Sequence, residues 1–170
     1  MNFALPSATG ILRVGLISDT HGFIDPAVST LFHGVDLILH AGDIGPRKIR
    51  TSLEQLAPLI AVLGNNDFDA DLRETETLKI GPWKVLVQHI VDPSNPLPDL
   101  ARKLERAEPH LVVFGHTHRT YDATHNQIRF INPGYSGRKR FEELRSIALL
   151  ECSTLALNLS VHSLPNPPKP

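Results

Sequence analysis

The sequence contains only one cysteine, Cys152, among its 170 residues. An internal disulfide is therefore excluded, and a reducing compartment is expected. No apolar run approaches the roughly 18 residues that a membrane-spanning helix requires, and the first residues lack the cationic and strongly apolar segments of a signal sequence. Neither sign of charge prevails, since the formal net charge is −1. This balance argues against a dedicated nucleic-acid or anionic-membrane binder, and we expect a cytoplasmic protein.

Hydrophobic residues make up 41% of the chain and charged residues 21%, as in an ordinary globular protein of one domain. We expect a loosely ordered lead-in over residues 1–10, one domain over residues 11–163 and a proline-rich tail over residues 164–170. Nine histidines stand against the single cysteine. Any metal site is therefore expected to use imidazole and oxygen ligands rather than thiolates.

Strands and helices alternate in the first part of the chain. Buried strands are predicted over 11–17, 35–39 and 59–63. Helices are predicted to begin at Asp25-Pro26, with Asp25 as N-cap, and at Pro46. These units imply a largely parallel sheet with right-handed crossovers.

The second part of the chain has a different rhythm. Hairpins are predicted around Gly81-Pro82 and around Asn126-Gln127. Between them we expect a helix with Leu97, Leu100 and Leu104 facing inward, followed by a buried strand over 111–114. Two closing strands are predicted over 146–150 and 155–161.

Polar side chains follow the predicted strands, and successive groups are 22 to 27 residues apart, about one strand with its crossover. Because the carboxyl ends of parallel strands meet, we expect all these groups to emerge at the same edge of the sheet. Seven nitrogen and oxygen donors exceed what one ion with four to six ligands needs, so two ions sharing a carboxylate are the simplest arrangement. The donors are Asp19, His21, Asp43, Asn65, His89, His116 and His118.

In this order, the motifs D-x-H, G-D, G-N-x-D, H and G-H-T-H resemble those of the calcineurin-like metallophosphoesterase superfamily, in particular its small single-domain phosphodiesterases from bacteria and archaea. The similarity extends from about Ile11 to about Gly137. It implies an α/β fold in which helices flank a sandwich of two β-sheets, four layers in all. It also implies that one metal ion is bound by Asp19, His21, Asp43 and His118, and the other by Asp43 as the bridge with Asn65, His89 and His116.

The resemblance further implies hydrolysis of phosphoesters, phosphodiesters in preference, by in-line attack of a hydroxide held between two divalent ions, with Asp43 and Asn66 as catalytic residues. Manganese is the first expectation, although Ni, Fe, Zn and Co also suit this ligand set. The expected partner is a small phosphoester, and a homo-oligomer is compatible with the sequence. The alternative is a catalytically weak or inactive scaffold of the same fold, which the small retromer subunit exemplifies. The near-neutral charge does not support a nuclease but leaves one open.

Three positions depart from the family pattern. Asn66 stands where many relatives have histidine. An amide can donate a hydrogen bond to a phosphoryl oxygen but cannot act as a general acid near neutral pH, which predicts substrates with good leaving groups. His89 is followed by Ile90 rather than the usual glycine. Tyr135 stands where serine is usual, and it either enters the cleft or packs beneath it.

Some nearby residues have supporting roles in this interpretation. His40 either orients a ligand or is a satisfied histidine at a strand end. Asp67 is expected to hold a loop through hydrogen bonds rather than to bind metal. Glycines 42, 64 and 115 are expected to let the backbone turn sharply beside the metals.

Overall fold

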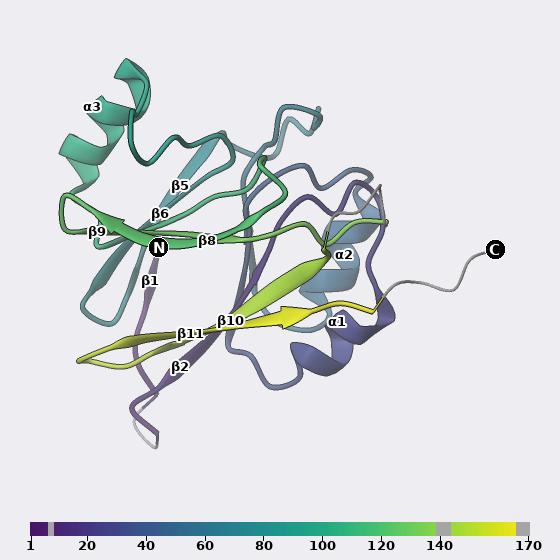
Figure 1. Ribbon diagram of the computed structural model, residues 1–170. Coiled ribbons are helices and arrows are strands. Elements are labelled where there is room, and N and C mark those ends of the chain that lie inside the picture. The colour runs from purple at the N-terminus through teal and green to yellow at the C-terminus, as the bar shows by residue number, and fades with distance from the viewer. Residues whose placement is uncertain (7–8, 139–143, 166–170) are drawn as a thin grey trace.

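The computed structural model describes residues 1–6, 9–138 and 144–165, which form two sheets packed against each other (Figure 1). One sheet has five strands in the order β11 (Leu157–Ser163), β10 (Ser146–Cys152), β2 (Leu12–Ile17), β3 (Leu37–His40), β4 (Leu59–Ala61). The other has six, in the order β1 (Asn2–Phe3), β5 (Thr75–Ile80), β6 (Trp83–Gln88), β7 (Leu111–Val113), β9 (Ile128–Pro133), β8 (Thr120–His125). The helices are α1 (Pro26–Leu31), α2 (Lys48–Glu54) and α3 (Pro98–Ala107).

Three apolar clusters hold the layers together. The largest lies between the two sheets and includes Leu16, Leu39, Val87 and Val113. A second, with Val28 of α1 and Leu53 of α2, lies on the outer face of the five-stranded sheet, and a third packs α3 on the outer face of the other sheet. Successive strand residues point to opposite faces of a sheet. Because apolar clusters cover both faces of each sheet, the central strands carry apolar residues on both sides. The predicted fold class, a two-sheet sandwich flanked by helices in four layers, is confirmed.

The local predictions for the helices are confirmed for α1 and only in part for α3. Asp25 caps α1, its side chain accepting from the N–H of Ala27 at 3.0 Å, and Pro26 is the first helical residue. In α3, Leu100 is buried, but Leu97 is 69% exposed. Leu97 occupies the N-cap position of that helix, outside its first turn, and so does not share its inward face.

Both predicted hairpins are present, and their turns fit the residues found there. Strands β5 and β6 pair antiparallel around Gly81-Pro82. Strands β8 and β9 pair around Asn126 and Gln127, whose φ angles of 49° and 67° are those of a two-residue hairpin turn.

One expectation about the ends of the chain needs correction. The lead-in is not without regular structure, because β1 pairs in parallel with β5 at the edge of the six-stranded sheet. At the other end, Leu164, the first residue of the expected proline-rich tail, is buried, and its N–H donates to the Arg145 carbonyl at 2.8 Å. The rest of the tail prediction, residues 166–170, lies outside the described residues. Within the described part of the chain, none of the helices is long and apolar enough to cross a membrane.

Candidate metal centre

The predicted site residues all follow the carboxyl ends of strands, but the strands belong to both sheets. Asp19 and His21 follow β2, Asp43 follows β3 and Asn65 follows β4 in the five-stranded sheet. In the six-stranded sheet, His89 follows β6 directly, and His116 and His118 follow β7. The expectation that all groups emerge at the edge of a single sheet is therefore wrong. The site lies where the ends of two packed sheets meet.

Two groups of side chains bring potential ligand atoms within 4.8 Å of one another: Asp19 with His21 and His118, and Asp19 with Asp43 and His89. In the first, Asp19 Oδ1 lies 3.4 Å from His118 Nε2. In the second, Asp43 Oδ2 lies 3.4 Å from His89 Nε2. Asp43 Oδ2 also lies 3.6 Å from His21 Nε2, so this carboxylate faces both groups.

Asn65 and His116 lie beside these two groups. The Oδ1 atom of Asn65 is 3.0 Å from Nδ1 of His116, and the His116 ring centroid is 5.3 Å from that of His89. The backbone N–H of His116 donates to Asp19 Oδ2 at 3.1 Å. All seven predicted ligands are therefore neighbours at one end of the sandwich.

The donor set fits a cation on physical grounds. Asp19 and Asp43 are 0% and 2% exposed, and Asp19 Oδ1 and His89 Nε2 are buried without a hydrogen-bond partner. His89 Nδ1 lies 2.7 Å from the carbonyl of Ala41, to which it can only donate, so Nε2 carries the lone pair in the neutral ring. Mixed oxygen and imidazole donors suit divalent transition metals.

The electrostatics of the pair Asp43 and His89 favour charge. Burial opposes ionisation of Asp43, but the contact with His89 and two hydrogen bonds from Asn66 outweigh it and hold the pKa of Asp43 well below its usual range. Burial likewise opposes the charged form of His89, yet the contact with Asp43 and the charge of Asp19 raise its pKa above the ordinary value. Positive charge is thus stabilised between these two carboxylates.

The backbone at the site is unusual. Asp19, His21, Asp43, His116 and His118 all have positive φ angles, between 43° and 68°. Such conformations cost free energy in residues other than glycine and concentrate at functional sites.

The nearby glycines are needed mainly for space. Of Gly42, Gly64 and Gly115, only Gly42 has a positive φ, +95°, and a Cβ there would lie 2.7 Å from the His89 ring. The expected turns are present at Gly64 and Gly115 without a positive φ at either glycine: the Gly64 carbonyl accepts from the N–H of Asp67 at 3.2 Å, and the Gly115 carbonyl from that of Thr117 at 2.7 Å. A Cβ at Gly64 would overlap Asp43, and one at Gly115 would overlap Ser18 and Asp19. Glycine lets the loops approach the ligands closely.

Comparison with known proteins agrees with this geometry. Residues 12–155 match the model of the calcineurin-like phosphoesterase superfamily domain. The chain belongs to this family. It is 34% identical over 132 residues to a probable metallophosphoesterase of Methanocaldococcus jannaschii, covering 74% of this chain and 68% of the relative. It is 29% identical over 145 residues to one of Bacillus subtilis, covering 82% and 83%.

Solved structures share the fold at lower identity. One, described as a novel archaeal phosphodiesterase, superposes with a TM-score of 0.72 at 22% identity over 90% of this chain and 100% of the other. Wild-type Vps29 of Entamoeba histolytica complexed with zinc gives the same TM-score and identity over 89% and 99%. At these identities the likeness establishes the fold.

Asn66, one of the two predicted catalytic residues, is engaged with Asp43. Its backbone N–H donates to Asp43 Oδ1 at 2.9 Å, and its Nδ2 donates to Asp43 Oδ2 at 2.7 Å. The amide therefore orients the carboxylate in this structure, and a contact of Asn66 with substrate stays a prediction.

Tyr135 packs beneath the site rather than entering the cleft. It is 0% exposed, and its ring stacks on His118 with centroids 4.5 Å apart. Its hydroxyl donates to the carbonyl of Arg138 at 2.7 Å. The open choice about this residue is thus resolved in favour of packing.

Asp67 holds the site loops together, as predicted. Its carboxylate accepts from the backbone N–H groups of Ile44, Gly45 and Gly64, at 2.9 to 3.0 Å. It thereby clamps the loop after β3 to the loop after β4.

Two supporting residues had no predicted role. Ser18 donates to Asp19 Oδ2 at 2.6 Å, and Asn132 donates to the carbonyl of Gly115 at 2.7 Å. The sequence signal that could have indicated these roles is that Ser18 lies in the S-D-T-H motif and Asn132 in the N-P-G motif. A hydroxyl or amide beside a ligand carboxylate or loop is suited to hold it in place.

Residues of the loop over 64–67 line two hollows in the surface. One is lined by Asn65 and His89, among others, and the second by Asn66 and the 97% exposed Phe68. The first hollow thus includes two of the predicted ligands, whereas none of the seven lines the second.

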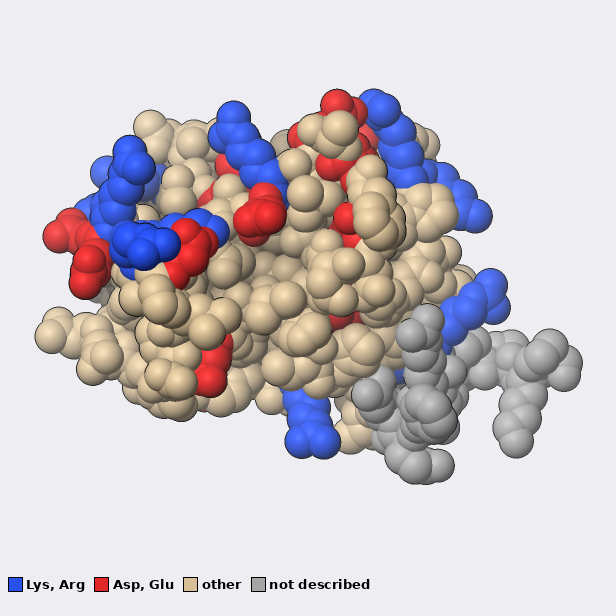
Figure 2. All heavy atoms as spheres, turned by 90° about the horizontal axis from the view of Figure 1, so that it is seen from above, with Lys and Arg blue, Asp and Glu red and all other residues tan. Residues whose placement is uncertain are grey.

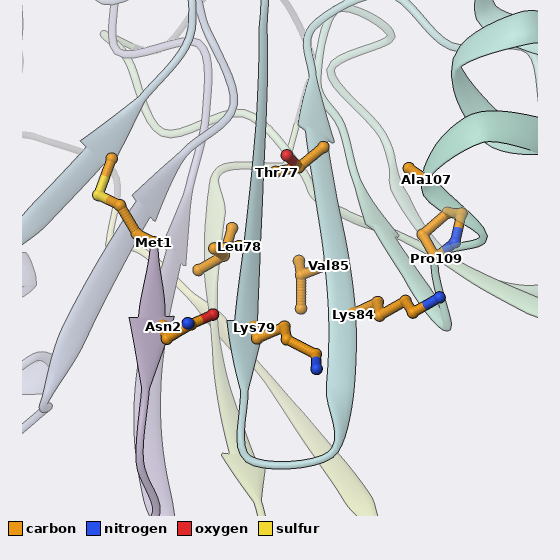
Figure 3. Close-up of a pocket in the computed structure, with 9 residues that line it drawn as sticks. All are labelled: Met1, Asn2, Thr77, Leu78, Lys79, Lys84, Val85, Ala107 and Pro109. Atoms are coloured by element: carbon orange, nitrogen blue, oxygen red, sulfur yellow. The ribbon is translucent and has the colours of Figure 1, made fainter.

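A separate hollow lies over β1, β5 and β6, with Lys79 and Lys84 on adjacent strands (Figure 3). Lys84 is at the start of β6, whereas His89 follows its end, roughly 16 Å away at the rise of a strand. The amino group of Lys84 pairs with Glu108 at 2.9 Å. Figure 2 shows the surface from above, with basic and acidic side chains interspersed. The hollow over β1, β5 and β6 is not part of the metal centre, because none of the predicted ligands lines it.

Proposed function

We propose that this protein is a divalent-metal-dependent phosphodiesterase. The observation that carries the proposal is the pair of buried carboxylates, Asp19 and Asp43, facing the imidazoles of His21, His89 and His118 at 3.4 to 4.0 Å. Two bound ions would supply an activated water for in-line attack and neutralise the phosphoryl oxygens. Membership in the phosphoesterase family supports the reaction class.

Within this proposal the seven ligands divide into two sets. One ion is held by Asp19, His21, Asp43 and His118, and the other by Asp43 with Asn65, His89 and His116. The position of Asp43 Oδ2, 3.4 Å from His89 and 3.6 Å from His21, supports its role as the bridge. Manganese remains the first candidate, and the zinc complex of Vps29 shows that a protein of this fold takes zinc.

The protein's own residues prepare this site in defined ways. Ser18 and the backbone of His116 hold Asp19 Oδ2, which leaves Asp19 Oδ1 directed at the histidines. Asn66 holds both oxygens of Asp43. No imidazole stands at position 66 to protonate a leaving group, which favours esters with good leaving groups. The archaeal phosphodiesterase of the same fold supports the preference for diesters.

The test compares hydrolysis of bis(4-nitrophenyl) phosphate and 4-nitrophenyl phosphate by metal-stripped protein with Mn²⁺, Ni²⁺ or Zn²⁺ restored. We expect metal-dependent turnover, faster for the diester, and a loss of about 100-fold or more in Asp43→Asn, since that residue would contact both ions. Asp122→Asn is the matched control, because Asp122 of β8 pairs with Arg129 of β9 at 2.7 Å and is not a predicted ligand. Equal losses in both variants would contradict the assignment.

The second candidate is a binding module with little or no catalytic activity. It is favoured by Asn66, whose amide is turned onto Asp43, and by the structural likeness to Vps29. Binding of metal without turnover of either ester would support this alternative and contradict the hydrolase.

A further inference from the structure

His40, the last residue of β3, lies between the two loops that carry the carboxylates of the proposed metal centre. Its side chain is 0% exposed. It makes no hydrogen bond to a proposed ligand side chain among the described residues, but it contacts the backbone and hydroxyl groups beside them. Such a residue can only act through its neighbours.

The hydrogen bonds of His40 fix its tautomer. The backbone N–H of Gly42 donates to Nδ1 at 3.2 Å, so Nδ1 carries a lone pair. In the neutral ring the proton is then on Nε2, which lies 3.0 Å from Thr20 Oγ1. The Thr20 hydroxyl in turn donates to the carbonyl of Ile44 at 2.9 Å. Nε2–H therefore donates to Thr20, so both ring nitrogens of His40 and the Thr20 hydroxyl have hydrogen-bond partners.

The neutral form is also the one that burial favours. Burial lowers the pKa of His40 from 6.5 to about 4, with Asp19 and Asp67 opposing the shift. The imidazole is thus uncharged at neutral pH.

These hydrogen bonds of His40 and Thr20 join two loops whose backbones are strained. Thr20 stands between Asp19 and His21, and Gly42 and Ile44 stand on either side of Asp43. The same loops share two backbone bonds, from Asp19 N–H to the Gly42 carbonyl at 3.0 Å and from His21 N–H to the Asp43 carbonyl at 2.9 Å. His40 adds the side-chain connection between them.

We propose that neutral His40 is a positioning residue, which fixes the distance between the Asp19–His21 loop and Asp43 by accepting from Gly42 and donating to Thr20. This inference rests on the proposed metal centre. Groups that orient metal ligands typically contribute 10- to 100-fold to metal affinity.

Two matched pairs of variants test the role. Thr20→Val removes the hydroxyl at nearly constant shape, and Thr20→Ser restores it. His40→Gln places an amide N–H near the Nε2 position, whereas His40→Asn places its amide near Nδ1 and cannot reach Thr20. We expect Thr20→Val and His40→Asn to weaken Mn²⁺ and Zn²⁺ binding by about 10- to 100-fold, and Thr20→Ser and His40→Gln to stay within about threefold of wild type.

Metal affinity is measured by competition with a chelator, and thermal unfolding of the metal-free variants reports whether each is folded. If Thr20→Val and His40→Asn unfold at lower temperature but bind metal like wild type, the role of His40 is purely structural. That result would overturn the proposal. A ¹⁵N NMR spectrum of metal-free wild type that placed the His40 proton on Nδ1 would also overturn it. Wild-type protein that binds no divalent metal would instead contradict the proposed function, and the His40 inference with it.

Discussion

Arg145 is the largest fully buried side chain among the described residues, and its replacement gives the sharpest test of how the loop beneath the metal centre is held. Its NH1 group donates to Asp25 Oδ2 at 2.8 Å, and its NH2 group donates to the carbonyl of Ser136 at 3.1 Å. It also donates to the carbonyls of Gly137 and Pro165, both at 2.5 Å. One guanidinium thereby joins the N-cap of α1 to the loop after β9 and to the residues after β11.

We predict that Arg145→Met lowers the free energy of unfolding by about 3–5 kcal/mol. Asp25 is 4% exposed, so the substitution leaves a buried carboxylate without its charged partner, which typically costs this much. The three carbonyls that accept from Arg145 also lose their donors. Because the N–H of Gly137 donates to the Asp19 carbonyl at 3.0 Å, the effect reaches the site loop.

The assay is urea unfolding of the metal-free protein followed by circular dichroism. Lys84→Met is the control: its partner Glu108 has a side chain 76% exposed, and loss of such an exposed pair costs less than about 1 kcal/mol. The double variant Asp25→Asn with Arg145→Met is expected to recover part of the loss, because the unpaired charge is gone. A loss below about 1 kcal/mol in Arg145→Met would refute the reasoning.

Three further predictions concern single groups. Burial raises the pKa of Cys152 to about 12, so native protein at pH 8 is expected not to react with a thiol reagent until guanidinium unfolds it. The folded pKa of His40, about 4, lies below the unfolded value of 6.5. The unfolded chain therefore binds the proton first as pH falls. Between pH 6.5 and 4 wild type should lose up to about 3 kcal/mol of its free energy of unfolding, which His40→Gln should retain. Urea unfolding at each pH measures this difference. In Gly64→Ala the new Cβ overlaps Asp43, and metal affinity measured against a chelator should fall about tenfold or more.

Most elements of this fold could be predicted from the chain because their signals are local. The cap at Asp25, the hairpin turn at Asn126-Gln127 and the buried strand before Gly115 each depend on a few consecutive residues. That the seven candidate ligands lie close together could be predicted for the same reason, since each follows a strand, and their role as metal ligands stays a prediction. Strand β1 could not, because two residues carry no periodicity and its pairing with β5 is a contact distant in sequence.

The division of the site between two sheets could not be read from spacing. An interval of about one strand and crossover is the same whether the next strand joins the same sheet or the one packed against it. His89 follows Asn65 by an interval like the others, yet β6 pairs with β5 and β7 rather than with β4. The orientations of Asn66 and Tyr135 depend likewise on partners far along the chain, Asp43 and His118.

The left-handed backbone conformations separate the site from ordinary turns. Eight residues other than glycine have positive φ among those the structure describes. Asn126 and Gln127 form a hairpin turn, and Glu108 is the C-cap of α3, places where this conformation is usual. The other five are all predicted metal ligands, the aspartates and histidines Asp19, His21, Asp43, His116 and His118.

At those five positions glycine would be the more stable choice for the backbone, by about 1–2 kcal/mol at each. Glycine has no side chain to offer, so carboxylates and imidazoles occupy these positions because their chemistry outweighs the backbone preference. The strained loops persist because hydrogen bonds hold their backbones in place. The Asp67 carboxylate accepts hydrogen bonds from three backbone N–H groups, and His40 and Asn132 bind the backbones of the neighbouring turns. Outside ordinary turns and caps, the strain falls on donor residues and is held by hydrogen bonds, which is the pattern of a site built to place ligands.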